Sequence, residues 1–160
     1  MDEFAADPAL PKPELYRELL AAAEALTAGE PDAVANMANL AALIGLWLPD
    51  LNWAGFYRLQ GDVLVLGPFC GKPACIRIPL GQGVCGTAAA ERASQLVADV
   101  HAFPGHIACD AASRSELVVP VLRAGEVIAV IDLDSPLPGR FDAADQAGLE
   151  ALAVLVSARI

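Results

Sequence analysis

The sequence predicts a single α+β domain built around an antiparallel sheet. Helical periodicity is concentrated near the two ends of the chain, whereas the middle reads as short apolar strands joined largely by turns. At 160 residues the chain is long enough to bury one full core. We expect an irregular arm over residues 1–13, where prolines and charges alternate, and one folded domain over residues 14–160.

The predicted helices have a structural role. Apolar residues recur three and four apart over 14–28, up to Gly29, and again between Pro31 and Pro49. Asp142 is a suitable N-cap for a helix that continues toward the C-terminus. A shorter helix is expected to follow the glycine-rich stretch at 81–86, which lacks the ending of a phosphate-binding loop. These helices are expected to pack the core or a dimer face.

One predicted strand is rich in aromatic residues. Strands are expected over 52–59, 63–69, 76–78, 95–97, 116–123 and 126–134. Because side chains alternate along a strand, Trp53, Gly55 and Tyr57 share a face, with a gap between the two rings at Gly55. The aromatic pair either fills the core or forms one wall of a small-ligand pocket, which could hold an ammonium group by cation–π attraction.

Two adjacent strands are expected to gather three carboxylates. Asp132 and Asp134 point the same way, about 7 Å apart, and such like charges need a cation, a shared proton or water. The preceding turn decides where Glu116 points. A two-residue Ala-Gly loop would need positive φ at both positions, so we expect a three-residue loop over 123–125 with Gly125 left-handed. That loop pairs Glu116 with Asp132 and places all three carboxylates on one face.

The cysteines fall close to this acidic face. Four cysteines are too few for a disulfide-stapled scaffold, and no C-x-x-C occurs. Cys75, Cys85 and Cys109 lie in loops or at a helix start, where backbone N–H groups should lower the pKa of the Cys85 thiol. His101, His106 and Cys109, together with Cys75 or Cys85, could form a zinc site, but the spacing matches no standard zinc pattern, and no metal is expected.

Composition excludes several classes of function. A formal charge of −10 argues against nucleic acid and against anionic membrane surfaces. The most apolar run, Leu40–Leu48, is far shorter than the roughly 20 residues of a membrane-spanning helix. The first residues lack the basic start and apolar core of a signal peptide. A soluble, cytoplasmic protein is therefore expected.

Six stretches closely resemble the free methionine-(R)-sulfoxide reductase family. They are L-N-W-A-G-F-Y (51–57), L-G-P-F (66–69), G-K-P-A-C-I-R-I-P-L-G-Q-G-V-C-G-T-A (71–88), D-V-H-A-F-P-G-H-I-A-C-D-A-A-S (99–113), S-E-L-V-V-P (115–120) and V-I-D-L-D-S (130–135). The resemblance covers nearly the whole chain from residue 51, and the amino-terminal helices match in pattern only. It implies a GAF-domain fold, with a central antiparallel sheet of about six strands between helices, and a homodimer.

The resemblance also implies roles for particular residues. The family's redox cysteines fall on Cys75, Cys85 and Cys109. Its substrate-binding residues fall on Glu116, Asp132 and Asp134 and on an aromatic wall of Trp53 and Tyr57. There are two departures. Cys70 stands where the family usually has glutamine, and Arg114 replaces a usual asparagine, which adds a cation near the acidic site.

The expected activity is reduction of free L-methionine (R)-S-oxide without metal, flavin or nucleotide. A thiolate attacks the sulfur, a protonated carboxyl supplies a proton, and the resulting sulfenic acid condenses with a second thiol to a disulfide. Thioredoxin then reduces that disulfide. We expect Cys109 as nucleophile, because its loop leads directly to Glu116, with Cys75 and Cys85 as resolving candidates; the pKa argument favours Cys85 instead. The alternative is a GAF sensor for an amine, which gives no reason for three cysteines.

Overall fold

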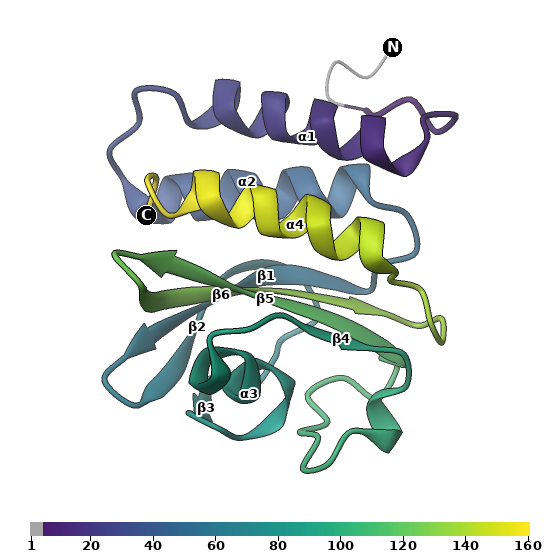
Figure 1. Cartoon of the computed structure of the whole chain (residues 1–160), viewed down its shortest axis with the longest axis vertical. Coiled ribbons are helices and arrows are strands. Elements are labelled where there is room, and N and C mark those ends of the chain that lie inside the picture. The colour runs from purple at the N-terminus through teal and green to yellow at the C-terminus, as the bar shows by residue number, and fades with distance from the viewer. Residues whose placement is uncertain (1–4) are drawn as a thin grey trace.

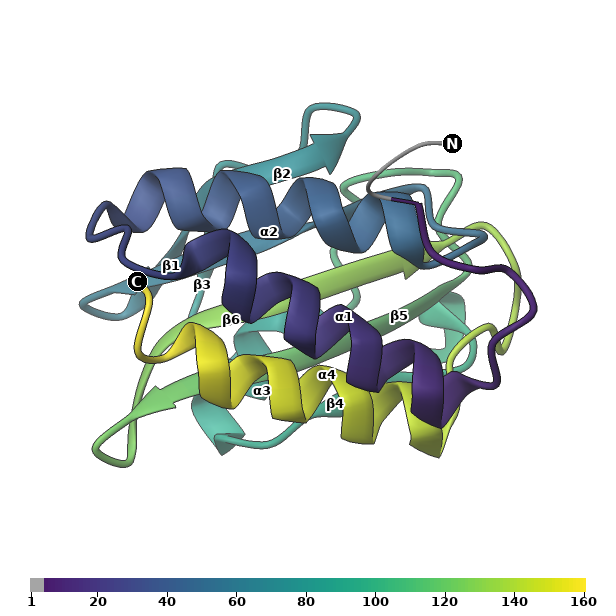
Figure 2. The ribbon, with the colours of Figure 1, turned by 90° about the horizontal axis from the view of Figure 1, so that it is seen from above.

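Four layers make up the fold of the computed structural model, which describes residues 5–160. The central layer is a single antiparallel sheet (Figure 1). Helices α2 (Ala33–Trp47) and α4 (Ala143–Val156) cover one face of it. Helix α1 (Lys12–Thr27) packs across both as an outer layer (Figure 2). The short helix α3 (Gly83–Glu91) and a long loop cover the other face.

The sheet contains six strands in the order β3-β2-β1-β6-β5-β4. Their bounds are β1 Trp53–Gln60, β2 Val63–Gly71, β3 Arg77–Pro79, β4 Gln95–Val97, β5 Ser115–Arg123 and β6 Glu126–Ser135. A 3-10 turn, Val100–Ala102, interrupts the loop between β4 and β5. The predicted α+β class with a six-stranded antiparallel sheet is confirmed.

Side-chain alternation divides the interior into two apolar clusters, one on each face of the sheet. Phe56, Leu117 and Leu133 point toward α2 and α4 and form part of the larger cluster. Their neighbours in sequence point the other way, toward α3, where Tyr57 and Val118 belong to the smaller cluster. The smaller cluster holds the aromatic pair and Cys85, so the predicted site lies on the α3 face.

The start of helix α1 is joined to the start of helix α4 by ionic contacts. Helix α1 begins at Lys12, inside the stretch expected to be irregular, and residues 1–4 of that stretch lie outside the described residues. Lys12 Nζ lies 2.9 Å from Asp142 Oδ2 and 2.8 Å from Asp145 Oδ2. Asp142 is the N-cap of α4, as predicted, and accepts from the backbone N–H groups of Ala144 and Asp145. None of the described helices has the length and apolarity needed to cross a membrane.

The predicted three-residue turn between β5 and β6 is wrong. Arg123 pairs with Glu126 across a two-residue loop, in which Ala124 and Gly125 both have positive φ, 51° and 78°. A bulge after Val121 then inserts one extra residue into β6, which shifts the register again.

Because of this second shift, the three carboxylates still share one face. Glu116 lies opposite Asp134 rather than opposite Asp132, and Val118 faces Asp132. The predicted partner of Glu116 was therefore wrong by two residues along β6, whereas the predicted face was right.

Candidate active site

A cavity lies on the α3 face of the sheet, between strands β1, β5 and β6 and the loops that precede β3 and β5. Every site residue expected from sequence lines it except Cys75, which is bonded to Cys109 at its edge. The lining residues among them are Trp53, Tyr57, Cys85, Cys109, Glu116, Asp132 and Asp134. The fold therefore brings the predicted residues together from strands β1, β5 and β6, from the start of α3, and from the loops that precede β3 and β5.

Three carboxylates form the floor of the cavity. Glu116 and Asp132 are 6% and 5% exposed, and Asp134 is partly buried. Burial, followed by the charges of Asp132 and Asp134, raises the pKa of Glu116 well above its usual range. Burial also raises the pKa of Asp132, although contacts with Glu116 and Cys85 work in the opposite direction. Burial, followed by the charge of Asp132, also raises the pKa of Asp134 well above its usual range. Glu116 and Asp134 therefore both favour the protonated form beside Asp132.

Asp132 also carries an unpaired oxygen. Its Oδ1 atom is buried and accepts no hydrogen bond from the residues that the structure describes. Buried polar atoms without partners are uncommon in folded proteins. The floor of the cavity thus presents an acceptor that a bound ammonium or other donor would satisfy.

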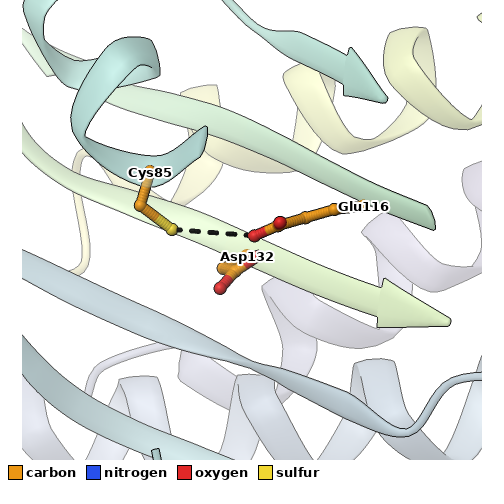
Figure 3. Close-up of side chains that lie close together, drawn as sticks. All are labelled: Cys85, Glu116 and Asp132. Atoms are coloured by element: carbon orange, nitrogen blue, oxygen red, sulfur yellow. Dashed lines mark hydrogen bonds between the residues drawn. The ribbon is translucent and has the colours of Figure 1, made fainter. Parts of the chain in front are cut away.

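Cys85 points onto this floor from the first turn of α3 (Figure 3). Its Sγ lies 4.0 Å from Glu116 Oε1, and the residue is 4% exposed. Burial, then the charges of Asp132, Glu116 and Asp134, raises the pKa of the Cys85 thiol well above its ordinary value. The predicted lowering of this pKa by the helix start is therefore wrong, because loss of water and nearby negative charge outweigh the helix dipole.

Cys75 and Cys109 form a disulfide with their Cα atoms 5.5 Å apart. The bond joins the loop between β2 and β3 to the long loop before β5, which are 34 residues apart in sequence. In this state neither sulfur can act as a thiolate ligand with His101 or His106, whose rings lie 6.4 Å apart. Cys70 and Cys85 remain as free thiols.

Within residues 5–160, a group that could hold a metal ion is formed by Cys85, Glu116 and Asp132, whose ligand atoms lie within 4.8 Å of one another. All three groups have raised pKa values, so a metal would have to displace protons to bind there.

The aromatic residues serve as both core and wall. Trp53 stacks on Tyr57 with ring centroids 5.8 Å apart, and on Phe69 at 5.1 Å. Phe69 fills the space beside Gly55, where an added Cβ would lie 2.4 Å from the Phe69 Cβ, so the predicted gap is absent. Tyr57 Oη donates to the Cys75 carbonyl at 2.9 Å, and Trp53 Nε1 donates to the carbonyl of Lys72 at 3.1 Å. The two rings thereby hold the loop that carries Cys75.

Several lining residues were missed by sequence reasoning. Lys72 brings a positive side chain to the cavity, and Asp110 and Ser113 line it beside Cys109. Asn52, just before β1, donates to Asp110 Oδ2 at 3.0 Å and to Ser113 Oγ at 3.1 Å. The only available signal was their place within the family-like motifs, because polar residues in loops follow no periodicity.

The two departures from the family pattern lie away from the cavity. Cys70 points to the opposite face of the sheet, where its Sγ donates to the Ala41 carbonyl at 3.4 Å and packs beside Gly45. Arg114 is exposed and does not line the cavity, so the cation predicted near the acidic site is not supplied by Arg114.

Known proteins resemble this chain in sequence and in fold. Residues 9–160 match the model of a GAF domain family. The free methionine-R-sulfoxide reductase of Escherichia coli is 53% identical over 88% of this chain and 86% of its own. That of Saccharomyces cerevisiae is 44% identical over 92% of this chain and 87% of its own.

A solved structure agrees with these relatives. The free methionine-R-sulfoxide reductase of Neisseria meningitidis, determined in complex with its substrate, superposes with a TM-score of 0.92 at 44% identity and covers 97% of this chain and 93% of its own. Fold, site and sequence lead to one conclusion: this chain belongs to the free methionine-R-sulfoxide reductase family of GAF-domain proteins.

Proposed function

We propose that this protein reduces free methionine (R)-sulfoxide to methionine by cysteine chemistry, with thioredoxin as the reductant. The observation that carries the proposal is the Cys75–Cys109 disulfide at the edge of a cavity whose floor is three crowded carboxylates. A redox-active thiol pair and a proton donor are the two requirements of sulfoxide reduction. The activity named for the bacterial and yeast relatives supports the same reaction.

In the first step, the Cys109 thiolate attacks the sulfoxide sulfur. The oxygen is transferred to Cys109 as a sulfenic acid, Glu116 supplies one proton, and methionine leaves with the electron pair on its sulfur. In the second step, the Cys75 thiol attacks the sulfenic sulfur, and the oxygen leaves as water while the disulfide forms. Two thiols have then lost two hydrogens, and the dithiol of thioredoxin restores them by exchange.

Charge distribution in the cavity suits a free amino acid. The ammonium group would pair with Asp132 and Asp134, where Asp132 Oδ1 has no partner among the described residues. The α-carboxylate would face Lys72, which has the opposite charge. Trp53 and Tyr57 would pack against the methyl and thioether groups. A peptide-bound methionine sulfoxide lacks both terminal charges and would lose both ion pairs.

Geometry also supports an order for the thiols. Cys109 has a partner in Cys75, which favours Cys75 as the resolving cysteine. Cys85 is buried with a raised pKa, so its thiol stays protonated and is a poor nucleophile near neutral pH. A thioredoxin-dependent cycle fits a reducing compartment such as the cytoplasm. We also propose that the protein forms the homodimer implied by the family resemblance.

The test couples thioredoxin and its reductase to NADPH consumption, with the R and S epimers supplied separately, each free and within a peptide. We expect turnover only for the free R epimer. Intact mass provides a second readout, because one equivalent of the substrate should remove two hydrogens from the reduced protein. A binding module of the GAF type would bind the amino acid without any change in mass, and that result would refute the proposal.

A further inference from the structure

One side chain, Asn52, ties the segment of Cys109 to the sheet. Its Nδ2 group donates to Asp110 Oδ2 at 3.0 Å and to Ser113 Oγ at 3.1 Å. Its backbone N–H donates to the Asp134 carbonyl at 3.0 Å. Asn52 therefore connects the loop beside the proposed nucleophile with the strand that carries a cavity carboxylate.

Apart from Asn52, the Arg114 N–H ties the end of this loop to the sheet by donating to the Ser135 carbonyl at 2.8 Å. The backbone hydrogen bonds of residues 106, 109 and 113 all end on carbonyl groups of the same loop. Cys109 itself is held by the disulfide, but that bond is open during half of the proposed cycle. In the reduced protein, the hydrogen bonds from Asn52 remain as ties between the Cys109 segment and the residue that precedes β1.

The electrostatic setting strengthens these ties. A hydrogen bond from the Ala112 N–H, together with Asn52 and the charge of Lys72, holds the pKa of Asp110 below its ordinary value, so the Asp110 carboxylate is ionised. A hydrogen bond from a neutral amide to an ionised carboxylate is stronger than one between neutral groups. Ser113 in turn interacts with Asp134. Asn52 thus stands at the centre of a short polar chain that ends on the floor of the cavity.

The orientation of the Asn52 amide fits this role. Both hydrogen bonds from Nδ2 go to the loop, while Oδ1 is buried and finds no donor among the described residues. Leaving a buried acceptor unpaired is unfavourable. The amide is held in this orientation by its contacts with the loop.

We propose that Asn52 is a positioning residue that holds Cys109 at the substrate-binding carboxylates while the Cys75–Cys109 disulfide is open. The inference rests on the proposed function, because it gives Cys109 the role of nucleophile. A looser Cys109 segment should present its sulfur to the substrate less often, and it should also meet Cys75 less often.

The test compares Asn52→Ala with a swap variant, Asn52→Asp combined with Asp110→Asn. The swap reverses donor and acceptor but retains a hydrogen bond between the two positions. The matched control is Asn36→Ala. Asn36 is a buried asparagine, whereas Asn52 is half-buried, and the Asn36 Nδ2 donates to the Glu30 and Arg159 carbonyls away from the cavity. Three quantities are measured for each variant: the single-turnover rate constant for methionine formation, the thiol–disulfide equilibrium of Cys75 and Cys109 with glutathione, and thermal stability.

We expect Asn52→Ala to slow methionine formation at least tenfold and to shift the glutathione equilibrium at least tenfold toward the reduced form. The swap should recover most of both losses. Asn36→Ala should lose thermal stability but keep both redox quantities. The proposal is overturned if Asn52→Ala matches the wild type, if the swap recovers neither quantity, or if Asn36→Ala shows the same losses. The glutathione equilibrium needs no sulfoxide, so it tests Asn52 even if the wild-type protein forms no methionine.

Discussion

Glu116→Gln should separate the stability of this protein from its chemistry. Glu116 is buried beside Asp132 and Asp134, and its pKa in the folded state is raised well above the usual range. Below the ordinary glutamate pKa, both the folded and unfolded states hold this proton. As pH rises from there toward the folded pKa, only the unfolded state releases the proton, so the free energy of unfolding falls.

The size of the effect follows from the proton count. One proton retained only by the folded state lowers the free energy of unfolding by up to about 1.4 kcal/mol per pH unit, or about 2.7 kcal/mol between pH 5 and pH 7. Glutamine cannot ionise, so Glu116→Gln should remove this contribution and flatten the pH dependence. The side-chain amide can still donate to Asp132, as the protonated carboxyl does. Loss of the proposed proton donor should slow methionine formation by a factor of roughly 10²–10⁴.

The assay is urea unfolding of the reduced protein at pH 5, 6 and 7, paired with single-turnover kinetics at pH 7. Glu126→Gln is the control, because Glu126 is an exposed glutamate that pairs with Arg92 at the surface. We expect the wild type and Glu126→Gln to lose stability in parallel as pH rises, and Glu116→Gln to lose less. If all three proteins show the same slope, Glu116 does not retain a proton and cannot be the proton donor.

Three further predictions concern the substrate, the aromatic wall and the free thiol of Cys70. N-acetylation of methionine sulfoxide removes the ammonium charge and should lower kcat/KM well over tenfold, as expected for the loss of a charged hydrogen bond of about 1.5–3 kcal/mol. Equal turnover of the free and acetylated substrates would refute the assigned pocket. Because Lys72 is expected to face the α-carboxylate, Lys72→Met should abolish any preference for the free acid over its amide. Tyr57→Phe loses the hydrogen bond to the Cys75 carbonyl, so the rate of disulfide formation, monitored by intact mass, should fall about two- to tenfold. The rate at which methionine is released in the first step should be unchanged. An unaltered rate of disulfide formation would show that Tyr57 does not position Cys75. Cys70→Ser should keep full thioredoxin-dependent turnover, since Cys70 lies on the opposite face of the sheet from the cavity; loss of turnover in a folded variant would reveal a fourth redox thiol.

Much of the fold followed from local rules. Strand alternation was sufficient to place Glu116, Asp132 and Asp134 on one face, and side-chain capping was sufficient to start α4 at Asp142. The register across the β5–β6 hairpin did not follow. Ala124 adopts a positive φ that its side chain disfavours, and a bulge after Val121 restores the expected face. Such compensation depends on packing across the whole sheet, which no local pattern reports.

The candidate site shows the same division between local and tertiary effects. The helix start at Cys85 was predicted correctly, but its effect on the thiol was reversed by burial among carboxylates that are distant in sequence. The gap at Gly55 was predicted from one strand alone and is filled by Phe69 from the neighbouring strand. Asn52 lies far from Cys109 in sequence, so only the folded chain brings the two segments together.

Single-turnover methionine formation by Cys→Ser variants, without any external reductant, tests the central claim most directly. The account predicts no methionine from Cys109→Ser, because that variant lacks the proposed nucleophile. Cys75→Ser and Cys85→Ser should each form up to one equivalent, since both retain Cys109 and lose at most the step that follows. Cys75→Ser should then accumulate a sulfenic acid, because Cys75 is the disulfide partner of Cys109. A full equivalent from Cys109→Ser and none from Cys85→Ser would contradict the account and make Cys85 the nucleophile.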